Sequence, residues 1–205
     1  MQACKSQYDY TQLVFNYIEY NLAVNKDITV PSITDKFTST AKGRLSFDGP
    51  YLVSYSTRVA KFIHTKKATY ILTDVYKYSN TTSKQINILR NYLPNHIIAI
   101  GTTSIDYSFS YIKDYYFTCI YDTYTYCKRA RNGKHLQYAI ETHKSVIRSI
   151  ILELHPSTRK VTLRKLNTLP SIPDKLNKFT RPIILSILKD KGLLWQTNMN
   201  LLMRK

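Results

Sequence analysis

The stretch from residue 49 to residue 93 constrains the fold of this chain more than any other. It contains two runs rich in β-branched and aromatic residues, Tyr51–Ile63 and Ala68–Thr73, and the short polar segment His64–Lys67 joins them. Two such runs separated by a polar turn are typical of a β-hairpin. We therefore expect two antiparallel strands at the centre of the fold.

A helix is expected soon after this hairpin. The Ser/Thr-rich segment Ser79–Ser83 precedes Ile86, Leu89 and Leu93, which recur at helical spacing. Pro94 disfavours helical geometry in the residue before it, so the helix is expected to end near Leu93. The centre of the chain is thus predicted to run strand, turn, strand, helix.

Two short polar patterns stand out in this stretch. The first is Ser-Tyr-Ser-Thr-Arg-Val-Ala at Ser54–Ala60, and the second is Tyr-Ser-Asn-Thr-Thr-Ser-Lys-Gln at Tyr78–Gln85. They resemble a short bacteriophage domain of unknown function, which carries Ser-Tyr-x-Thr-x-Ile/Val-Ala followed by Tyr-Ser-x-Thr-Thr-Ser-Lys/Arg-His/Gln. Gln85 stands where that family more often has His. The resemblance, over residues 45–92, implies a phage origin and a shared fold, and it names no reaction.

The flanking segments predict further elements of an α+β fold. Residues 8–25 have apolar side chains at helical spacing, and residues 44–47 and 96–100 fit short strands. Asp48-Gly49 is a tight-turn signal between two of these strands. We expect a small antiparallel sheet of three to four strands with helices packed on one face.

The second half of the chain is predicted to be mainly helical. The segment from Ser104 to Tyr126 fits a helix, although its aromatic and Thr content leaves a strand open. Residues 135–154 give the clearest helical pattern, and residues 182–191 form a shorter one. Alternating apolar residues within residues 161–169 hint at one strand.

These patterns divide the chain into four predicted segments. They are an N-terminal helical segment (1–42), a β-hairpin/helix motif domain (43–101), a helical part of the same core (102–155) and a basic helical C-terminal extension (156–205). The extension should contribute less to folding, because prolines interrupt its first half. Leu193–Trp195 would give its end an apolar anchor.

Positive charge is concentrated toward the C-terminus. The 205 residues carry a net charge of +17, of which +13 falls in residues 128–205. Clustered Lys and Arg neutralise phosphates and release counterions, which favours nucleic acid of either kind with little sequence preference. The residues predicted to contact phosphates are Lys84, Lys128, Arg129, Arg131, Lys134, Arg159, Lys160, Arg164 and Lys165.

The start of the central helix is a second candidate site. Thr81, Thr82, Ser83 and Lys84 lie where unsatisfied N–H groups and the helix dipole attract an anion. One hydroxyl is needed as the helix cap. The cluster therefore fits either a phosphate contact or capping alone.

Catalytic and metal-binding patterns are not found in the sequence. The five histidines are scattered, and the three cysteines show no Cys-x-x-Cys pair, so we predict no enzyme activity, no metal and no cofactor. No long apolar run predicts a membrane span. We expect a phage protein of the reducing host cytoplasm, or a virion-associated one, that binds DNA or RNA. The alternative is a virion or cargo component, or an inhibitor, that binds a viral or host protein.

Overall fold

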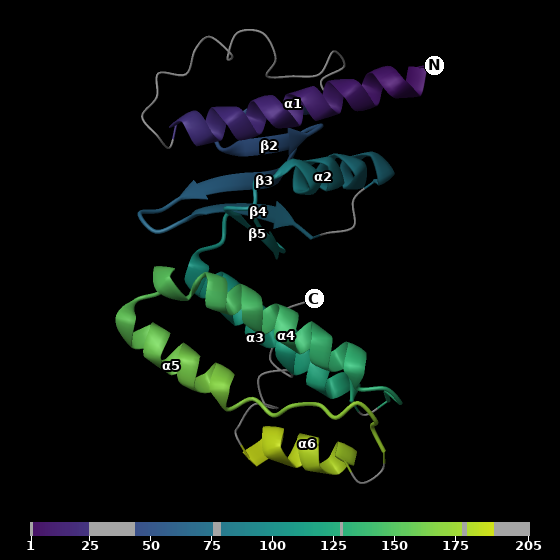
Figure 1. The fold of residues 1–205 in the computed structure, drawn as a ribbon, viewed down its shortest axis with the longest axis vertical. Coiled ribbons are helices and arrows are strands. Elements are labelled where there is room, and N and C mark those ends of the chain that lie inside the picture. The colour runs from purple at the N-terminus through teal and green to yellow at the C-terminus, as the bar shows by residue number, and fades with distance from the viewer. Residues whose placement is uncertain (1, 25–43, 76–78, 128, 178–179, 191–205) are drawn as a thin grey trace. The chain divides into compact units, whose positions relative to one another are not determined.

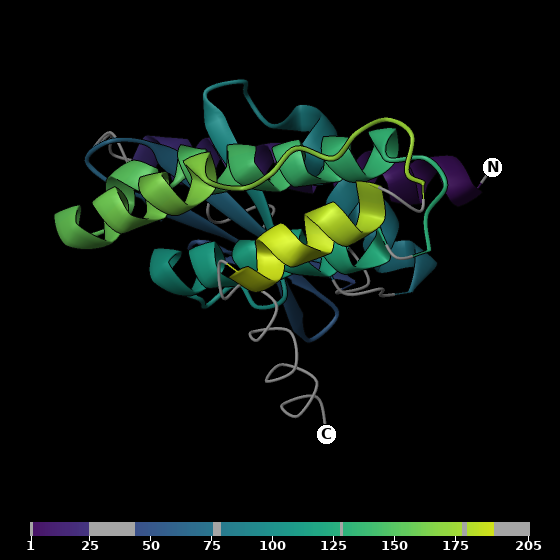
Figure 2. The same ribbon diagram turned by 90° about the horizontal axis from the view of Figure 1, so that it is seen from below.

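The computed structural model describes residues 2–24, 44–75, 79–127, 129–177 and 180–190. The chain forms two compact units that divide between Asp106 and Tyr107. Unit 1 (residues 1–106) holds a β-sheet and two helices, and unit 2 (residues 107–205) is helical (Figures 1 and 2). None of the helices in the described ranges is long and apolar enough to cross a membrane.

The sheet of unit 1 has five strands in the order β1-β2-β3-β4-β5. They are β1 (Leu45–Asp48), β2 (Tyr51–Ser54), β3 (Thr57–His64), β4 (Thr69–Asp74) and β5 (Ile97–Thr102). Strands β1 to β4 pair antiparallel, whereas β5 pairs parallel to β4. Helix α2 (Asn80–Tyr92) lies between β4 and β5, because parallel neighbours need a crossover connection.

Helices α1 (Gln2–Val24) and α2 pack on one face of this sheet (Figure 1). The spacing of the apolar residues in α1 places them in a single stripe that faces the strands. The buried residues of this stripe are Tyr10, Leu13, Val14, Tyr17 and Ile18. Tyr17 also donates a hydrogen bond from its hydroxyl to the carbonyl oxygen of Pro50, at 2.7 Å. The predicted α+β class is confirmed.

Two details of the sheet differ from the prediction. The run Tyr51–Ile63 is not one strand, because a turn at Tyr55 and Ser56 separates β2 from β3. Tyr55 has left-handed backbone geometry, with φ of 56°. The turn contains no Gly, Pro, Asn or Asp, which are the residues that most strongly indicate a turn. The sequence therefore does not predict the break between β2 and β3. The sheet also has more strands than the expected three to four, and β5 is parallel rather than antiparallel.

Unit 2 is built on the helix pair α3 (Phe109–Tyr126) and α4 (Lys134–Ser149). The segment that could have been helix or strand is therefore helix α3. Helix α4 ends at Ser149 rather than at the predicted Leu154, and the 3-10 turn η2 (Ile151–Glu153) follows it. Helices α5 (Pro156–Asn167) and α6 (Thr180–Asp190) complete the unit.

The strand predicted within residues 161–169 is wrong. Pro156 begins helix α5, where its fixed φ suits the first turn and its missing N–H has no helical partner to lose. The alternating residues Val161 and Leu163 are exposed, whereas Thr162 and Leu166, four residues apart, are buried. The buried pair follows helical spacing.

The predicted C-terminal extension belongs to the core of unit 2. Its buried apolar residues are Leu166, Leu169, Ile172, Leu176 and Ile184. From Tyr107 onward, the predicted segments 102–155 and 156–205 fall in one compact unit, and the two units divide after Asp106. The predicted anchor Leu193–Trp195 lies outside the described residues.

Candidate nucleic-acid interface

The hydroxyl cluster at the start of α2 is largely engaged in internal hydrogen bonds. Ser79 is the cap residue, and its side chain accepts a hydrogen bond from the backbone N–H of Thr82 at 3.3 Å. The Thr82 hydroxyl is buried and lies 2.9 Å from the Ser54 hydroxyl, which donates to Gln85 Oε1 at 2.7 Å. Gln85 Nε2 in turn donates to the carbonyl oxygen of Arg44 at 3.3 Å.

This motif network, formed by Ser54, Ser79, Thr82 and Gln85, joins the end of β2 to the first turn of α2. Buried polar groups need such partners, because an unpaired one costs about 1–3 kcal/mol. Of the predicted anion-binding residues, Thr82 has its hydroxyl inside this network, and Thr81 is partly buried. Only Ser83 and Lys84 are exposed. The geometry favours the capping interpretation of this helix start.

The four basic residues of α5 divide into two kinds. Lys160 and Arg164 are exposed, and the described part of the chain holds no ion-pair partner for them. Arg159 instead donates hydrogen bonds to the carbonyl oxygens of Ile151 and Leu152, at 3.2 and 2.9 Å. Those carbonyls follow the end of α4, so Arg159 stabilises a chain reversal and is not a free phosphate ligand.

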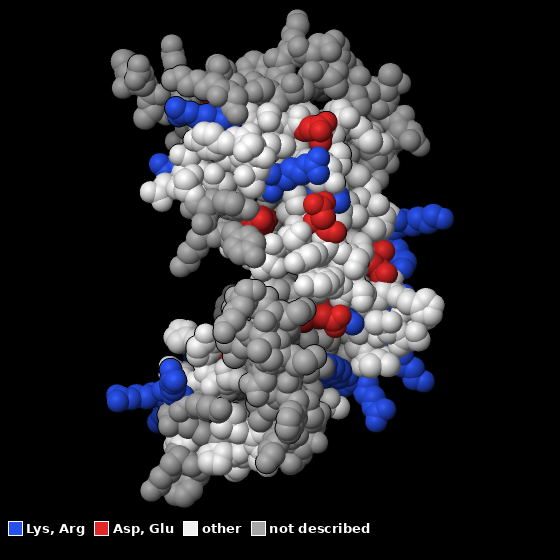
Figure 3. Space-filling view, turned by 180° about the vertical axis from the view of Figure 1, so that it is seen from behind, with Lys and Arg blue, Asp and Glu red and all other residues white. Residues whose placement is uncertain are grey.

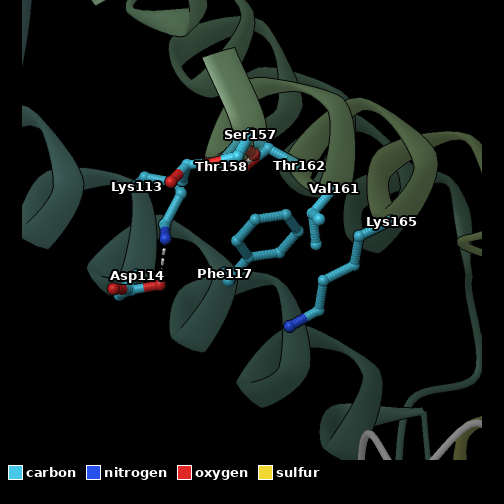
Figure 4. Close-up of a pocket in the computed structure, with 8 residues that line it drawn as sticks. All are labelled: Lys113, Asp114, Phe117, Ser157, Thr158, Val161, Thr162 and Lys165. Atoms are coloured by element: carbon cyan, nitrogen blue, oxygen red, sulfur yellow. Dashed lines mark hydrogen bonds and ion pairs between the residues drawn. The ribbon is translucent and has the colours of Figure 1, made fainter. Parts of the chain in front are cut away.

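Lys165 borders a cavity between α3 and α5 (Figure 4). The cavity has a volume of about 300 Å³ and is lined by Lys113, Asp114, Phe117, Ser157, Thr158, Val161, Thr162 and Lys165. The Lys165 ammonium lies 4.6 Å from the centroid of the Phe117 ring and 5.1 Å from that of Tyr121. Burial lowers the pKa of Lys165. Lys113, at the other side, is paired with Asp114 at 2.9 Å.

The second predicted patch forms a basic loop, residues 129–134, between α3 and α4. Arg129, Arg131 and Lys134 are exposed and form no ion pair with any described residue. Lys128, which was predicted with them, lies outside the described residues. The loop thus presents three unneutralised cations to solvent.

Backbone hydrogen bonds hold the basic loop against the segment that follows α5. Gly133 N–H donates to the Asp174 carbonyl at 2.7 Å, and Leu176 N–H donates to the Arg131 carbonyl at 3.3 Å. Gly133 is packed so closely that an added Cβ would lie 2.0 Å from the carbonyl oxygen of Pro173. The sequence cannot show this pairing, because the partners lie about forty residues apart.

The two units differ in net charge and in how it is neutralised. Unit 1 has 12 Lys and Arg against 7 Asp and Glu, whereas unit 2 has 18 against 6. In unit 2, Asp114 forms an ion pair with Lys113, and Glu141 lies near both Lys144 and Arg148, at 2.9 and 4.0 Å. Figure 3 shows Lys and Arg side chains projecting at two separate places in its lower half. The basic loop and the outer side of α5 therefore keep most of their charge.

Some residues of this surface were missed by sequence reasoning. Lys175 is exposed, and its backbone pairs with Asn132 beside the basic loop. Tyr126 and Tyr138 flank the loop and are 64% and 75% exposed. Tyr138 was identifiable in principle, since it falls outside the apolar stripe of α4 that contains Ile140 and Ile147. The pairing of Lys175 leaves no signal in the sequence.

Groups that could support metal binding are sparse. In the described part of the chain, no three His, Cys, Asp or Glu side chains come together in a metal-binding arrangement. His143 Nδ1 and the Tyr121 hydroxyl are buried without a hydrogen-bond partner there. Burial lowers the pKa of His143 and raises that of Tyr121. Cys127 is buried and Cys119 partly so.

Comparison with known proteins gives one match. Residues 22–95 match a family of unknown function (DUF8033). No curated protein and no solved structure matches the chain. The matched segment lies entirely in unit 1 and contains the motif network. The basic loop, α5 and the cavity all lie outside it.

Proposed function

We propose that this protein binds nucleic acid without catalysing a reaction, mainly through contacts between phosphates and the cations of unit 2. Because its central motifs resemble a bacteriophage domain, we further propose that it is a phage protein that acts in the reducing cytoplasm of the host. The binding residues are Arg129, Arg131 and Lys134 of the basic loop and Lys160 and Arg164 of α5. Lys165, whose ammonium lies over the rings of Phe117 and Tyr121 at the edge of the cavity, supports these contacts.

One observation carries this proposal. Asp114 and Glu141 form the ion pairs of the described part of unit 2, with Lys113, Lys144 and Arg148. The five binding cations are exposed and form no ion pair with a described residue. Concentrated like charge destabilises the compact state of a protein through self-repulsion. Such charge is useful when a polyanion neutralises it and counterions are released.

Three double variants of the full chain test the proposal, each removing two positive charges. Arg129→Ala/Arg131→Ala changes the basic loop, and Lys160→Ala/Arg164→Ala changes α5. The matched control is Lys66→Ala/Lys67→Ala, at an exposed turn of unit 1. Fluorescence anisotropy with a labelled oligonucleotide at several salt concentrations measures the affinity and its salt dependence.

The two unit 2 variants should each lose about tenfold in affinity, or ~1.4 kcal/mol. The slope of log K against log salt should fall by about two for each, one per lost phosphate contact. In the control, the loss of affinity and the fall in slope should each be less than about half as large. Equal losses in all three variants would mean that only net charge matters. No binding to any probe at low salt would overturn the proposal.

A protein partner is the second candidate function. Val161 and Leu163 of α5 are 66% and 40% exposed, and Lys160 and Arg164 flank them on the same helix. Exposed apolar residues beside cations fit a contact with an acidic protein surface. This favours a virion or cargo component, or an inhibitor of a host protein. Capture of one defined protein that survives nuclease treatment and is lost with Val161→Ser/Leu163→Ser would support it.

A further inference from the structure

The two most exposed aromatic rings in the described part of the chain lie at the two ends of the basic loop. Tyr138 is 75% exposed and Tyr126 is 64% exposed, ahead of Tyr111 at 52%. Tyrosine presents a broad apolar face that water solvates poorly, so it is usually at least partly buried. Two rings left this open beside three unpaired cations call for an explanation other than packing.

The positions of both rings are fixed by the local backbone. Tyr126 is the last residue of α3, and its carbonyl oxygen accepts hydrogen bonds from the N–H groups of Arg129 and Ala130, both at 3.0 Å. Tyr138 lies one helical turn after Lys134, at the i+4 position, so the two side chains share one face of α4. Each ring is thereby placed within one turn of a loop cation.

The loop between the rings is held in place before any ligand arrives. The N–H of Gly133 and the carbonyl oxygen of Arg131 are both paired with the segment after α5, and Asn132 Oδ1 accepts from the N–H of Lys134 at 2.8 Å. A surface held in one conformation loses little entropy on binding. The loop backbone that carries the cations therefore keeps its arrangement without a ligand.

We propose that the basic loop with Tyr126 and Tyr138 is a binding surface for single-stranded nucleic acid. Unpaired bases stack on the two tyrosine rings while Arg129, Arg131 and Lys134 contact the intervening phosphates. In a duplex the faces of the bases are already stacked on one another, so the rings have nothing to stack on. Cations and exposed aromatic rings together are the combination that single-strand binding uses. This inference rests on the proposed function and adds its substrate class.

The test compares a labelled thymidine oligonucleotide with a duplex of the same length, and uridine in place of thymidine tests RNA. The full-length variants are Tyr126→Ala, Tyr138→Ala and the two corresponding Phe substitutions, which keep a stacking face. The matched control is Tyr111→Ala, because Tyr111, in the first turn of α3, is also exposed but packs against the ring of Tyr107 at a centroid distance of 4.0 Å. Circular dichroism confirms that each variant is folded.

Each Tyr→Ala variant should lose about fivefold or more in single-strand affinity, as loss of a base–aromatic stack predicts. Duplex affinity, the Phe variants and Tyr111→Ala should all stay within about twofold of wild type. Equal loss for both probes, or unchanged single-strand binding, would overturn the inference while phosphate binding stands. If the wild type binds neither probe at low salt, the proposed function fails, and this inference fails with it.

Discussion

Polar and charged side chains are used differently in the two units. In unit 1, Ser54, Thr82 and Gln85 are buried in the motif network, and Lys61 pairs with Asp106 at 3.0 Å. In unit 2, Arg129, Arg131, Lys134, Lys160 and Arg164 are exposed and form no ion pair with a described residue. The motif residues of unit 1, which have the more distinctive sequence pattern, thus form internal hydrogen bonds that hold the fold together. The exposed cations of the basic loop and of α5 lie in unit 2, whose sequence pattern is less distinctive. A recognisable motif need not mark a binding site.

The largest expected effect tests whether the motif network is structural. Gln85→Leu would remove the Gln85 acceptor of the Ser54 hydroxyl and the Gln85 donor to the Arg44 carbonyl. Ser54 keeps its contact with Thr82, and the Arg44 carbonyl keeps the Tyr55 N–H. We expect unfolding of unit 1 to become easier by about 2–4 kcal/mol, while the folded protein keeps its affinity for nucleic acid. Hydrogen exchange of unit 1 amides and oligonucleotide titration measure the two quantities. The control is Ser83→Ala, because Ser83 is exposed in the same turn. If Gln85→Leu lowered the affinity for nucleic acid without lowering the stability of unit 1, the motif network would belong to the binding site.

A second change tests the opposite side of the comparison. Gly133→Ala would place a Cβ 2.0 Å from the Pro173 carbonyl oxygen, so the basic loop has to move. We expect a loss of about 1–3 kcal/mol in the stability of unit 2, together with weaker oligonucleotide binding. Thermal unfolding and anisotropy measure these effects. If stability falls while affinity stays at the wild-type level, the position of the loop does not matter for binding.

The backbone of unit 1 offers a smaller and opposite effect. Tyr55 has φ of 56°, which costs most residues about 1–2 kcal/mol and glycine very little. Tyr55→Gly should therefore stabilise unit 1 by about 0.5–1 kcal/mol, less than the strain because glycine has more freedom when unfolded. Gly49→Ala, at φ of 51°, should act in the reverse direction. Chemical denaturation measures both, and a destabilising Tyr55→Gly would mean that the Tyr55 side chain makes a needed contact.

The smallest expected effect concerns pH. Burial lowers the pKa of His64 in unit 1 and of His143 in unit 2, so both are held neutral when folded. The unfolded chain then binds more protons, and stability should fall as the pH drops below about 6.5, the usual pKa of histidine. Unfolding midpoints measured from neutral to mildly acidic pH check this. His143→Gln should reduce the loss, and an unchanged acid sensitivity would assign it to other groups.

Sequence reasoning succeeded where structure follows from local spacing. The apolar stripe of α1, with Leu13 and Tyr17, follows from periodicity alone. For α3, the spacing of residues such as Ile112 and Tyr116 fits a helix but leaves a strand open, and the structure shows the helix. It failed where a contact joins distant residues. The hydrogen bond from Ser54 to Gln85 spans 31 residues, and nothing near either residue announces it.

The candidate site was only partly predictable for the same reason. Arg129, Arg131, Lys134, Lys160 and Arg164 were recognised as basic, and their exposure agrees with that reading. Arg159 looks the same in the sequence, yet its guanidinium is occupied by backbone carbonyls that precede it in the chain. Lys175 joins the basic loop only through a bridge with Asn132. Composition gives the charge of a surface, whereas packing decides which charges are available.

The position of α1 has a consequence for the order in which the protein is made. The ribosome releases α1 first, but its apolar stripe packs on strands that are synthesised later. The Tyr17 hydroxyl bonds to a carbonyl 33 residues further along the chain. Until β1 to β3 have emerged, Leu13, Val14 and Ile18 have no surface to cover them, and nascent chains with exposed apolar stripes are prone to aggregate. A translational pause shortly before residue 64 should therefore lower the yield of soluble protein more than a pause in unit 2.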